Sequence, residues 1–302
     1  MPPRPRYERL ATERTNPRSR HLDRLGAPAI ARLMNREDRR AVAAVGRVAP
    51  AIGAAVDVIA RALGRGGRLF FVGAGTSGRL GVLEAAECPP TFGTPPALVQ
   101  AIMAGGHASV FRSREGAEDD AGAAARAVRA RVRGGDVVVG VSASGVTPFV
   151  RAALLAARRR GAATILVACN ARGARRRGLV IAPATGPEVL AGSTRLKAGT
   201  ATKLVLNTLT TASMARLGKV YGNRMVDLQP RSAKLRARAE RLVAEIGEVS
   251  RPRARRALAA ARGRVRLAIV IARRNLPADA AARALRAAGG SLRSVLERSA
   301  GR

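Results

Sequence analysis

The sequence contains few of the residues that bind metals or form cross-links. It has two cysteines, Cys88 and Cys169, and two histidines, His21 and His107. Two cysteines make no disulfide framework, and neither residue type stands at the spacing of a metal site. Tryptophan is absent and aromatic residues make up 2% of the chain, so platforms for base stacking are missing. We therefore predict no metal ion and no disulfide scaffold.

Long hydrophobic runs are also missing. The longest apolar runs, such as LAIVIA at 267–272, are far too short to cross a bilayer. The first twenty residues, MPPRPRYERLATERTNPRSR, contain no apolar core of a signal peptide. The sequence predicts a cytoplasmic protein with no membrane partner.

Acidic residues are scarce: 20 Asp and Glu stand against 55 Lys and Arg, which gives a formal net charge of +35. Such an excess favours contact with polyanions and attracts anionic ligands. The arginines, however, are spread through the chain, and no helix-turn-helix or zinc-finger pattern accompanies them. An arginine-rich composition explains the charge better than a nucleic-acid function does. We predict no specific nucleic-acid partner.

Lysine is rare in this arginine-rich chain. Lys197, Lys203 and Lys219 fall within residues 196–220, and Lys234 is the fourth. An ammonium and a guanidinium are not interchangeable. The grouping indicates a place where a compact cation is needed, with chance clustering as the alternative.

Apolar runs and helical patterns alternate along the chain, which is typical of an α/β fold with a parallel sheet sandwiched by helices. A hydrophobic content of 47% over 302 residues allows one large domain and a smaller one. We predict strands within 68–75, 96–106, 135–145 and 162–170, and helices at 28–49, 120–132, 148–159 and 199–217. The predicted domains are an N-terminal arm and helix (1–50), a central domain that contains the sheet (51–230) and a small all-helical domain (231–302). In the last, VRLAIVIA at 265–272 is assigned to a helix, Asp279 to a helix cap and Gly289–Gly290 to a helix end.

A glycine-rich turn follows the first predicted strand. Gly73-Ala-Gly75-Thr76-Ser77-Gly78 matches the GxGxxG pattern of dinucleotide sites. That alternative requires a carboxylate at the end of the second strand, where this chain reads MAGG. Thr76 and Ser77 instead offer hydroxyls at a helix start, where free N–H groups favour a phosphate. We predict that Gly75, Thr76 and Ser77 bind a small phosphate ester, with no cofactor.

Two further polar turns resemble the first in position. Ser142, Ser144 and Thr147 follow the third predicted strand and precede a helix. Ser193 and Lys197 lie in GSTRLKAGT, just before the long helix. A single loop of this kind is usually only a cap or a turn. Together, the loops predict a site for one sugar phosphate.

Carboxylates crowd into residues 84–120. Glu84 and Glu87 share a helix face, and Glu87 is expected in the last turn before Cys88-Pro-Pro, where carbonyl dipoles would raise its pKa. In REGAEDD at 114–120, Glu118 is the second candidate for acid–base chemistry, while Asp119 and Asp120 would begin a helix. Solvated acids near helix ends are the alternative interpretation.

The spacing of Ser77 and Glu87 constrains the site. An unbroken helix would place Glu87 roughly 15 Å beyond the phosphate-binding end. Either the chain turns at residues 78–81, or Glu87 serves a sugar held mainly by another subunit. We favour the shared site.

Five segments together resemble the N-acetylmuramic acid 6-phosphate etherases. They are ERTNPRSRHLD (13–23), GAGTSGRLGVLEAAECPPTFG (73–93), REGAEDD (114–120), SASGVTPFV (142–150) and GSTRLKAGTATKLVLN (192–207). The match covers residues 10–242, with a weaker similarity in the tail. The resemblance implies the sugar isomerase (SIS) fold, usually as a homodimer, and with the spacing of Ser77 and Glu87 we expect the site at or near the subunit interface.

The resemblance also implies a reaction. It is lyase cleavage of the D-lactyl ether of N-acetylmuramic acid 6-phosphate to N-acetylglucosamine 6-phosphate and D-lactate, in cell-wall sugar recycling or catabolism. The two acids would match Glu87, as proton donor to the departing lactate, and Glu118, as acid/base, in an elimination followed by hydration. The chain departs from the family at Val146 and Phe149, where an arginine and a phenol are common, and in a shorter, more basic segment at 171–178.

Three alternatives remain at the level of sequence. A non-catalytic sugar-phosphate sensor would not need both acids. An aldose–ketose isomerase would use the same loops but release no lactate. A polyanion-binding protein would ignore sugar phosphates and lose binding steeply with salt.

Overall fold

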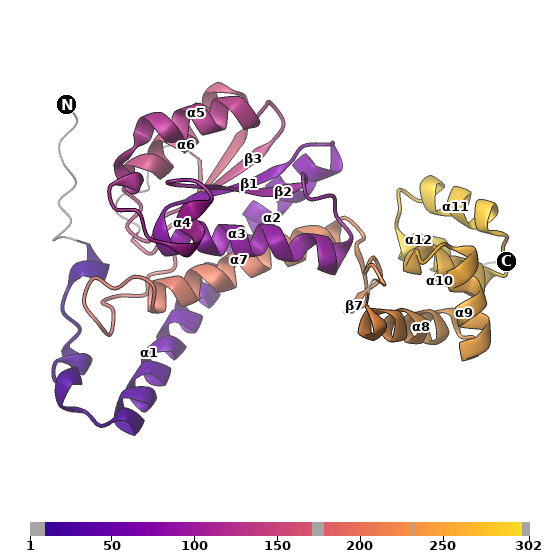
Figure 1. The fold of residues 1–302 in the computed structure, drawn as a ribbon, viewed down its shortest axis with the longest axis horizontal. Helices are drawn as coiled ribbons and strands as arrows, with labels where there is room; N and C mark the ends of the chain where they lie inside the picture. Colours follow the sequence, from indigo (N-terminus) through magenta and orange to yellow (C-terminus); the bar gives the residue numbers. More distant parts are fainter. Residues whose placement is uncertain (1–9, 171–177, 231, 298–302) are drawn as a thin grey trace. The chain divides into compact units, whose positions relative to one another are not determined.

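The computed structural model describes residues 10–170, 178–230 and 232–297 (Figure 1). The chain divides into two compact units. Unit 1 comprises Met1–Ala86 and Pro96–Ser213, and unit 2 comprises Glu87–Pro95 and Met214–Arg302. The predicted segment at 171–178 lies, except for Gly178, outside the described residues.

Unit 1 is built on a five-stranded parallel sheet. Its strands are β1 (Leu69–Gly73), β2 (Val99–Met103), β3 (Val137–Val141), β4 (Ala163–Val167) and β5 (Leu179–Ile181). They pair in the order β2-β1-β3-β4-β5, and Gly73 aligns with Met103 on one side and Val141 on the other. All five residues of both β1 and β3 are buried, as expected of central strands covered on both faces. The α/β fold class is confirmed.

Helices cover both faces of the sheet (Figure 1). Phe70 and Val72 of β1 share a core with α5 and α6, whereas Phe71 points to the other face, against Gly81 of α3. This alternation follows from the two-residue period of a strand. The helices of unit 1 are α1 (Ala27–Arg47), α2 (Ala49–Gly64), α3 (Gly75–Phe92, which continues into unit 2), α4 (Ala108–Phe111), α5 (Ala121–Arg131), α6 (Pro148–Arg159) and α7 (Lys197–Arg216, which also ends in unit 2). Short 3-10 turns are η2 (Ala11–Glu13), η3 (Pro17–Ser19), η4 (Leu22–Arg24) and η5 (Ala117–Asp119).

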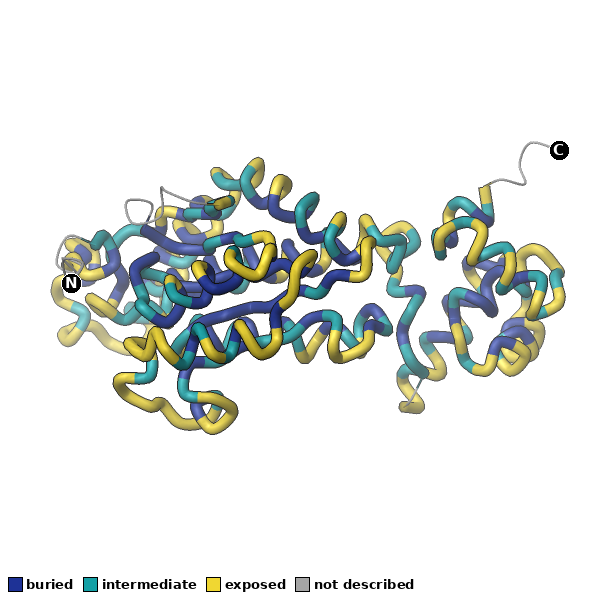
Figure 2. Tube along the Cα trace, turned by 90° about the horizontal axis from the view of Figure 1, so that it is seen from above, coloured by how far each residue is buried: buried dark blue, intermediate teal, exposed yellow. Residues whose placement is uncertain are grey.

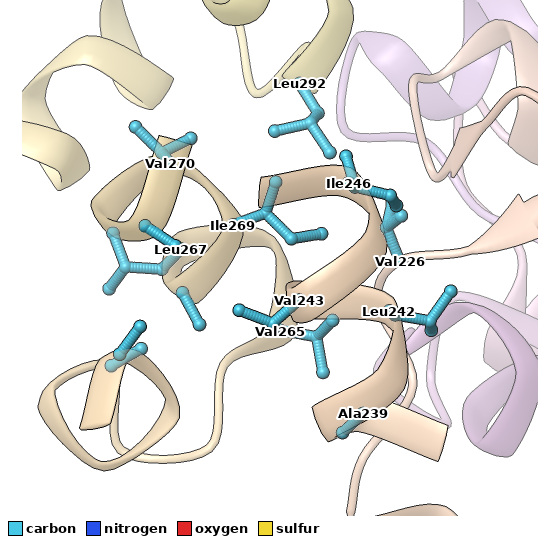
Figure 3. Packing of buried hydrophobic residues seen from close by; sticks show 14 of the residues in the cluster. Val226, Ala239, Leu242, Val243, Ile246, Val265, Leu267, Ile269, Val270 and Leu292 are labelled. Atoms are coloured by element: carbon cyan, nitrogen blue, oxygen red, sulfur yellow. The ribbon is translucent and has the colours of Figure 1, made fainter. Parts of the chain in front are cut away.

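Unit 2 is mostly helical and has its own core. Leu267, Ile269 and Val270 are almost fully buried on α10, and Val243 and Leu292 pack with them (Figure 3). Its elements are the hairpin of β6 (Val220–Tyr221) and β7 (Arg224–Met225), followed by α8 (Ala233–Gly247), α9 (Arg251–Ala260), α10 (Val265–Arg274), α11 (Ala278–Ala287) and α12 (Leu292–Glu297). Dark-blue stretches in Figure 2 mark the buried strands and the inward faces of the helices.

Most predicted elements are confirmed, and three details are corrected. The helix at 265–272 is α10, and Gly289 and Gly290, both at positive φ, follow α11. Asp279 lies in the first turn of α11, whose cap position is Pro277. The short strand β5 was not predicted, nor was the β6–β7 hairpin.

The third correction concerns α3. The helix contains Pro89 and Pro90 and ends at Phe92, so Glu87 is not in its last turn. A proline removes only its own backbone N–H, and near a helix end the other bonds can persist. Here the Gly93 N–H donates to the Pro89 carbonyl at 3.0 Å.

Among the described residues, no single helix is long and apolar enough to cross a membrane. Only α1 and α2 taken together, bent by 60°, meet that requirement of length and composition.

Candidate active site

The glycine-rich turn joins β1 directly to α3. Gly75 has φ +54°, a conformation that glycine adopts without strain. A Cβ on Gly78 would lie 2.2 Å from the Met103 sulfur and 2.6 Å from the Gly73 carbonyl oxygen, so helix and strand approach too closely for any side chain. Thr76 and Ser77 occupy the first turn of α3, and among the described residues their hydroxyls have no hydrogen-bond partner. The turn therefore presents free hydroxyls and helix-start N–H groups at the carboxyl end of β1.

Three hydroxyls converge after β3, the strand next to β1. The Ser142 hydroxyl lies 2.8 Å from that of Thr147 and 3.2 Å from that of Ser144. The backbone N–H of Gly145 donates to Ser142 and that of Val146 to Ser144, at 3.1 and 3.2 Å. Because β1 and β3 are parallel neighbours, this loop and the glycine-rich turn lie at the same edge of the sheet. The structure thus brings together the hydroxyl-bearing residues that the sequence singled out in this loop.

The third polar turn leads into α7 and is built around buried charges. The Lys197 ammonium is 2% exposed and donates to Glu37 Oε2 at 2.7 Å. The carboxylate of Glu188 accepts the backbone N–H groups of Lys197 and Ala198 at 2.9 Å, which caps the start of α7. Burial alone would raise the pKa of Glu37, but bonds from Lys197 and Asn16 outweigh it and hold that pKa below its usual value. Burial raises the pKa of Glu188.

Lys197 is therefore part of an ion pair. Its predicted role in binding phosphate stays a prediction, and it would require the ammonium to leave Glu37. Ser193, in the same turn, is half-buried. Thr76 of the glycine-rich turn reaches this region, because its methyl group would lie 3.8 Å from a Cβ placed on Gly199 of α7.

The N-terminal arm, residues 10–24, is tied to two of these polar turns. The Asn16 amide donates to Glu37 at 2.9 Å. The Asn170 amide donates to the Ala143 carbonyl at 3.0 Å and to the Thr12 hydroxyl at 3.2 Å, while its oxygen accepts the Ala11 N–H at 2.9 Å. Asn170 thus links the arm to the loop that carries Ser142, Ser144 and Thr147.

Glu118 lies at the glycine-rich turn. It sits exposed on η5 and lines a cavity of about 160 Å³ together with Gly75 and Arg79. Arg79 of α3 donates to the carbonyls of Val110 at 2.7 Å and Ser109 at 3.0 Å, and Ser109 also lines this cavity. Asp120 accepts the Ala123 N–H at 2.7 Å and caps α5, as predicted.

The two glutamates of α3 differ in environment. Glu84 is buried, accepts a bond from Thr210 at 2.6 Å and forms an ion pair with Lys203 at 2.8 Å. Glu87 is exposed. Because α3 is unbroken, the alternative of a turn at 78–81 is excluded, and ten residues of helix, roughly 15 Å, separate Ser77 from Glu87.

The clustered lysines all bind carboxylates. Lys197 pairs with Glu37, Lys203 with Glu84, and Lys219 with Asp227, at 2.7, 2.8 and 3.0 Å. Of the two residues that depart from the family, Phe149 lies in the first turn of α6 and is buried in the core that α6 shares with α5. Val146 is 8% exposed in the hydroxyl-rich loop. Within the described residues, no three of His, Cys, Asp and Glu gather as metal ligands.

Comparisons with known proteins identify the family of this chain. Residues 51–158 match the model of the glucokinase regulatory protein N-terminal SIS domain. An N-acetylmuramic acid 6-phosphate etherase of Gloeobacter violaceus is 53% identical over 99% of this chain and 98% of its own length. The etherases of Geobacillus thermodenitrificans and Mycolicibacterium smegmatis are each 50% identical, over 96% and 95% of this chain and 99% and 97% of theirs. The chain belongs to the N-acetylmuramic acid 6-phosphate etherase family.

Among solved structures, a phosphoheptose isomerase from Francisella tularensis has a TM-score of 0.48 and 16% identity, covering 62% of this chain and 97% of that one.

Sequence reasoning missed the polar residues that support the site in this etherase-family chain. Glu37 stands in the run REDRR and reads as a solvated acid, and Glu188 and Asn170 belong to no local motif. Asn16 lies inside ERTNPRSRHLD, one of the segments behind the family resemblance, and that was the available signal. The Asn16 amide donates to Glu37, 21 residues away, and to Pro187, 171 residues away. Glu37 and Lys197, which pair with each other, are 160 residues apart.

Proposed function

We propose that this protein cleaves the D-lactyl ether of N-acetylmuramic acid 6-phosphate, giving N-acetylglucosamine 6-phosphate and D-lactate. The observation that carries the proposal is the identity of about one half, over nearly the full length, with proteins named as etherases of that substrate. Glu87 and Glu118 stand in the segments that support the resemblance. The reaction belongs to recycling or catabolism of cell-wall amino sugars, in the cytoplasm.

In this proposal the phosphate binds at the edge of the sheet where β1 and β3 end. The free N–H groups and hydroxyls of Gly75, Thr76 and Ser77 meet it from one side. The hydroxyls of Ser142, Ser144 and Thr147, in the loop after β3, and of Ser193, in the turn before α7, complete the site. Lys197 joins them if its ammonium leaves Glu37. Hydroxyl and backbone donors suit a phosphate dianion, because each can donate one hydrogen bond to a phosphate oxygen.

The chemistry needs two carboxyl groups and no metal or cofactor. Glu118 takes the proton from C2 of the open-chain sugar, which is acidic because it adjoins the aldehyde. The electron pair forms the C2–C3 double bond, and the C3–O bond to lactate breaks. Glu87 protonates the departing lactate oxygen. Water then adds across the double bond, its hydroxyl at C3 and a proton at C2, which restores a saturated sugar.

We propose further that the protein works as a homodimer with each site shared between subunits. An unbroken α3 keeps Glu87 roughly 15 Å along the helix from Ser77, which is longer than a hexose 6-phosphate spans. In a two-fold dimer, Glu118 of one subunit would then work with Glu87 of the other.

The first test is release of D-lactate from N-acetylmuramic acid 6-phosphate. We expect release by the wild type and its loss in Glu87→Ala and Glu118→Ala, with Asp119→Ala, an exposed neighbour, as the matched control. Tight binding of the sugar phosphate without any lactate would contradict the etherase and favour a sensor.

The shared site is tested by a mixed dimer. One subunit carries Glu87→Ala, the other Glu118→Ala, and two affinity tags isolate the mixed species. Each mixed dimer would keep one of its two sites intact, so about half of the wild-type activity is expected. If each subunit holds a complete site of its own, the mixed dimer is no more active than the single variants.

A further inference from the structure

Unit 2 contains a cavity that takes no part in the proposed reaction. It has a volume of about 820 Å³ and is lined by the turn between α9 and α10, the segment 227–230, one side of α11, Gly93 and Lys219. A volume in this range is typical of sites for small molecules.

The inner wall of the cavity carries more positive than negative charge. Asp227 is the carboxylate of the lining, and it accepts bonds from Lys219 Nζ at 3.0 Å and from Arg266 Nε at 2.8 Å. The side chains of Lys219 and Arg266 are 28% and 14% exposed. One carboxylate thus neutralises one of two half-buried cations, and a net positive charge is left.

Keeping Lys219 and Arg266 charged in this cavity costs free energy when no anion is bound. Burial, and then the nearby Arg266, lower the pKa of Lys219, and burial lowers the pKa of Arg266. Both shifts mean that the charged forms are less stable here than in water. A bound anion would offset that cost and would stabilise the unit by mass action.

Two arginines at the mouth of the cavity are free to meet such an anion. Arg262 and Arg286 are exposed, and among the described residues their side chains have no hydrogen-bond or ion-pair partner. Arg262 has φ +52°, a left-handed conformation that is unfavourable for a residue with a side chain. It is held at the turn between α9 and α10, where it lines the cavity.

Apolar side chains form another part of the wall, beside Gln229 and Arg264, whose Nε donates to the Ala261 carbonyl. Leu228, Val265 and Leu267 are 2%, 2% and 4% exposed, and Leu285 of α11 is half-buried. A ligand that fills the cavity would place a hydrophobic part against these side chains. Inorganic phosphate alone would leave that surface unused.

We propose that this cavity binds a small phosphorylated molecule with an apolar body. The phosphate would bind Arg262 and Arg286, whose planar guanidinium groups match its oxygens in pairs. The apolar body would pack on Leu228, Val265 and Leu267. This site is independent of the reaction proposed above.

The experiment is methyl NMR of the full chain, observing Leu228, Val265 and Leu267, with phenyl phosphate, inorganic phosphate and phenol as probes. We expect saturable shifts with phenyl phosphate, and weaker binding of both inorganic phosphate and phenol. The Arg262→Gln/Arg286→Gln variant should bind phenyl phosphate about tenfold more weakly, because two charge-assisted contacts are lost. Ser142→Ala, in the proposed active site, should leave these methyl shifts unchanged.

The control is Arg283→Gln, which removes one charge from an exposed position of the same helix, α11. Equal weakening by Arg283→Gln and by Arg286→Gln alone, together with loss of binding in moderate salt, would mean diffuse attraction by the net charge of +35 and would overturn the proposal. Absence of methyl shifts with phenyl phosphate would overturn it as well.

Discussion

Replacing Lys197 with methionine leaves the carboxylate of Glu37 buried without its cation. Glu37 is 1% exposed, and the ammonium that it loses lies 2.7 Å from Oε2. Arg40, at 3.1 Å from Oε1, is half-exposed and compensates little. Breaking a buried pair from one side costs about 3–5 kcal/mol. We expect Lys197→Met to lower the free energy of unfolding by that amount in urea denaturation followed by circular dichroism.

The double variant Lys197→Met/Glu37→Leu tests whether the unpaired carboxylate causes the loss of stability. Replacing both charges with apolar groups of similar size removes the unpaired carboxylate, so most of the lost stability should return. An unchanged unfolding free energy in Lys197→Met would refute the reasoning, as would a double variant less stable than the single one. Lactate release then separates the two roles of Lys197: a double variant that is stable but inactive would make this lysine a phosphate ligand.

Three further outcomes are expected. Asn170→Ala should raise KM for the sugar phosphate more than it lowers kcat, because the hydroxyl-rich loop loses its tie to the arm, and steady-state kinetics will check this. Gly78→Ala should destabilise the protein by about 1–3 kcal/mol through overpacking. Gly53→Ala, with nothing within 4 Å of the new Cβ, should instead stabilise α2 by about 0.5–1 kcal/mol. Thermal melts of the two variants would compare their stabilities. Burial tends to raise the pKa of Asp136, but bonds from Arg68 and Arg133 outweigh it and lower that pKa. Its contribution to stability is therefore present above the ordinary pKa of 3.8 and is lost as pH falls through the lower native value, so Asp136→Asn should flatten the acid limb of unfolding free energy against pH.

The sheet could be predicted because its strands are encoded locally. The runs around β1, β3 and β4 are apolar and followed by turn residues, so their period and their ends are both visible in the sequence. Strand β5 has three residues and follows an arginine-rich stretch, so it offers no such pattern. Pro89 and Pro90 suggested a helix end too early, because proline near a helix end does not dictate where the helix stops.

The site could be predicted only in part. The hydroxyl-bearing loops carry their own turn chemistry, and Ser142, Ser144 and Thr147 meet within six residues. Glu37 pairs with Lys197, 160 residues away, and Asn170 bonds to Ala11 and Ala143. Such pairings depend on how distant segments fold together, so they cannot be predicted from a local sequence pattern.

The ion pair between α1 and α7 and the bond between the arm and Asn170 also have a consequence during synthesis on the ribosome. Glu37 leaves the ribosome long before Lys197, from which it is separated by 160 residues, and Asn170 emerges 159 residues after Ala11. Contacts of such long sequence separation form late. A nascent chain that stops before residue 197 lacks the ammonium of the buried ion pair with Glu37, and one that stops before residue 170 also lacks the amide that ties the arm to the loop of Ser142, Ser144 and Thr147. The earliest residues to be translated are thus among the last to reach their native positions, and until then the apolar surface that they will cover stays exposed.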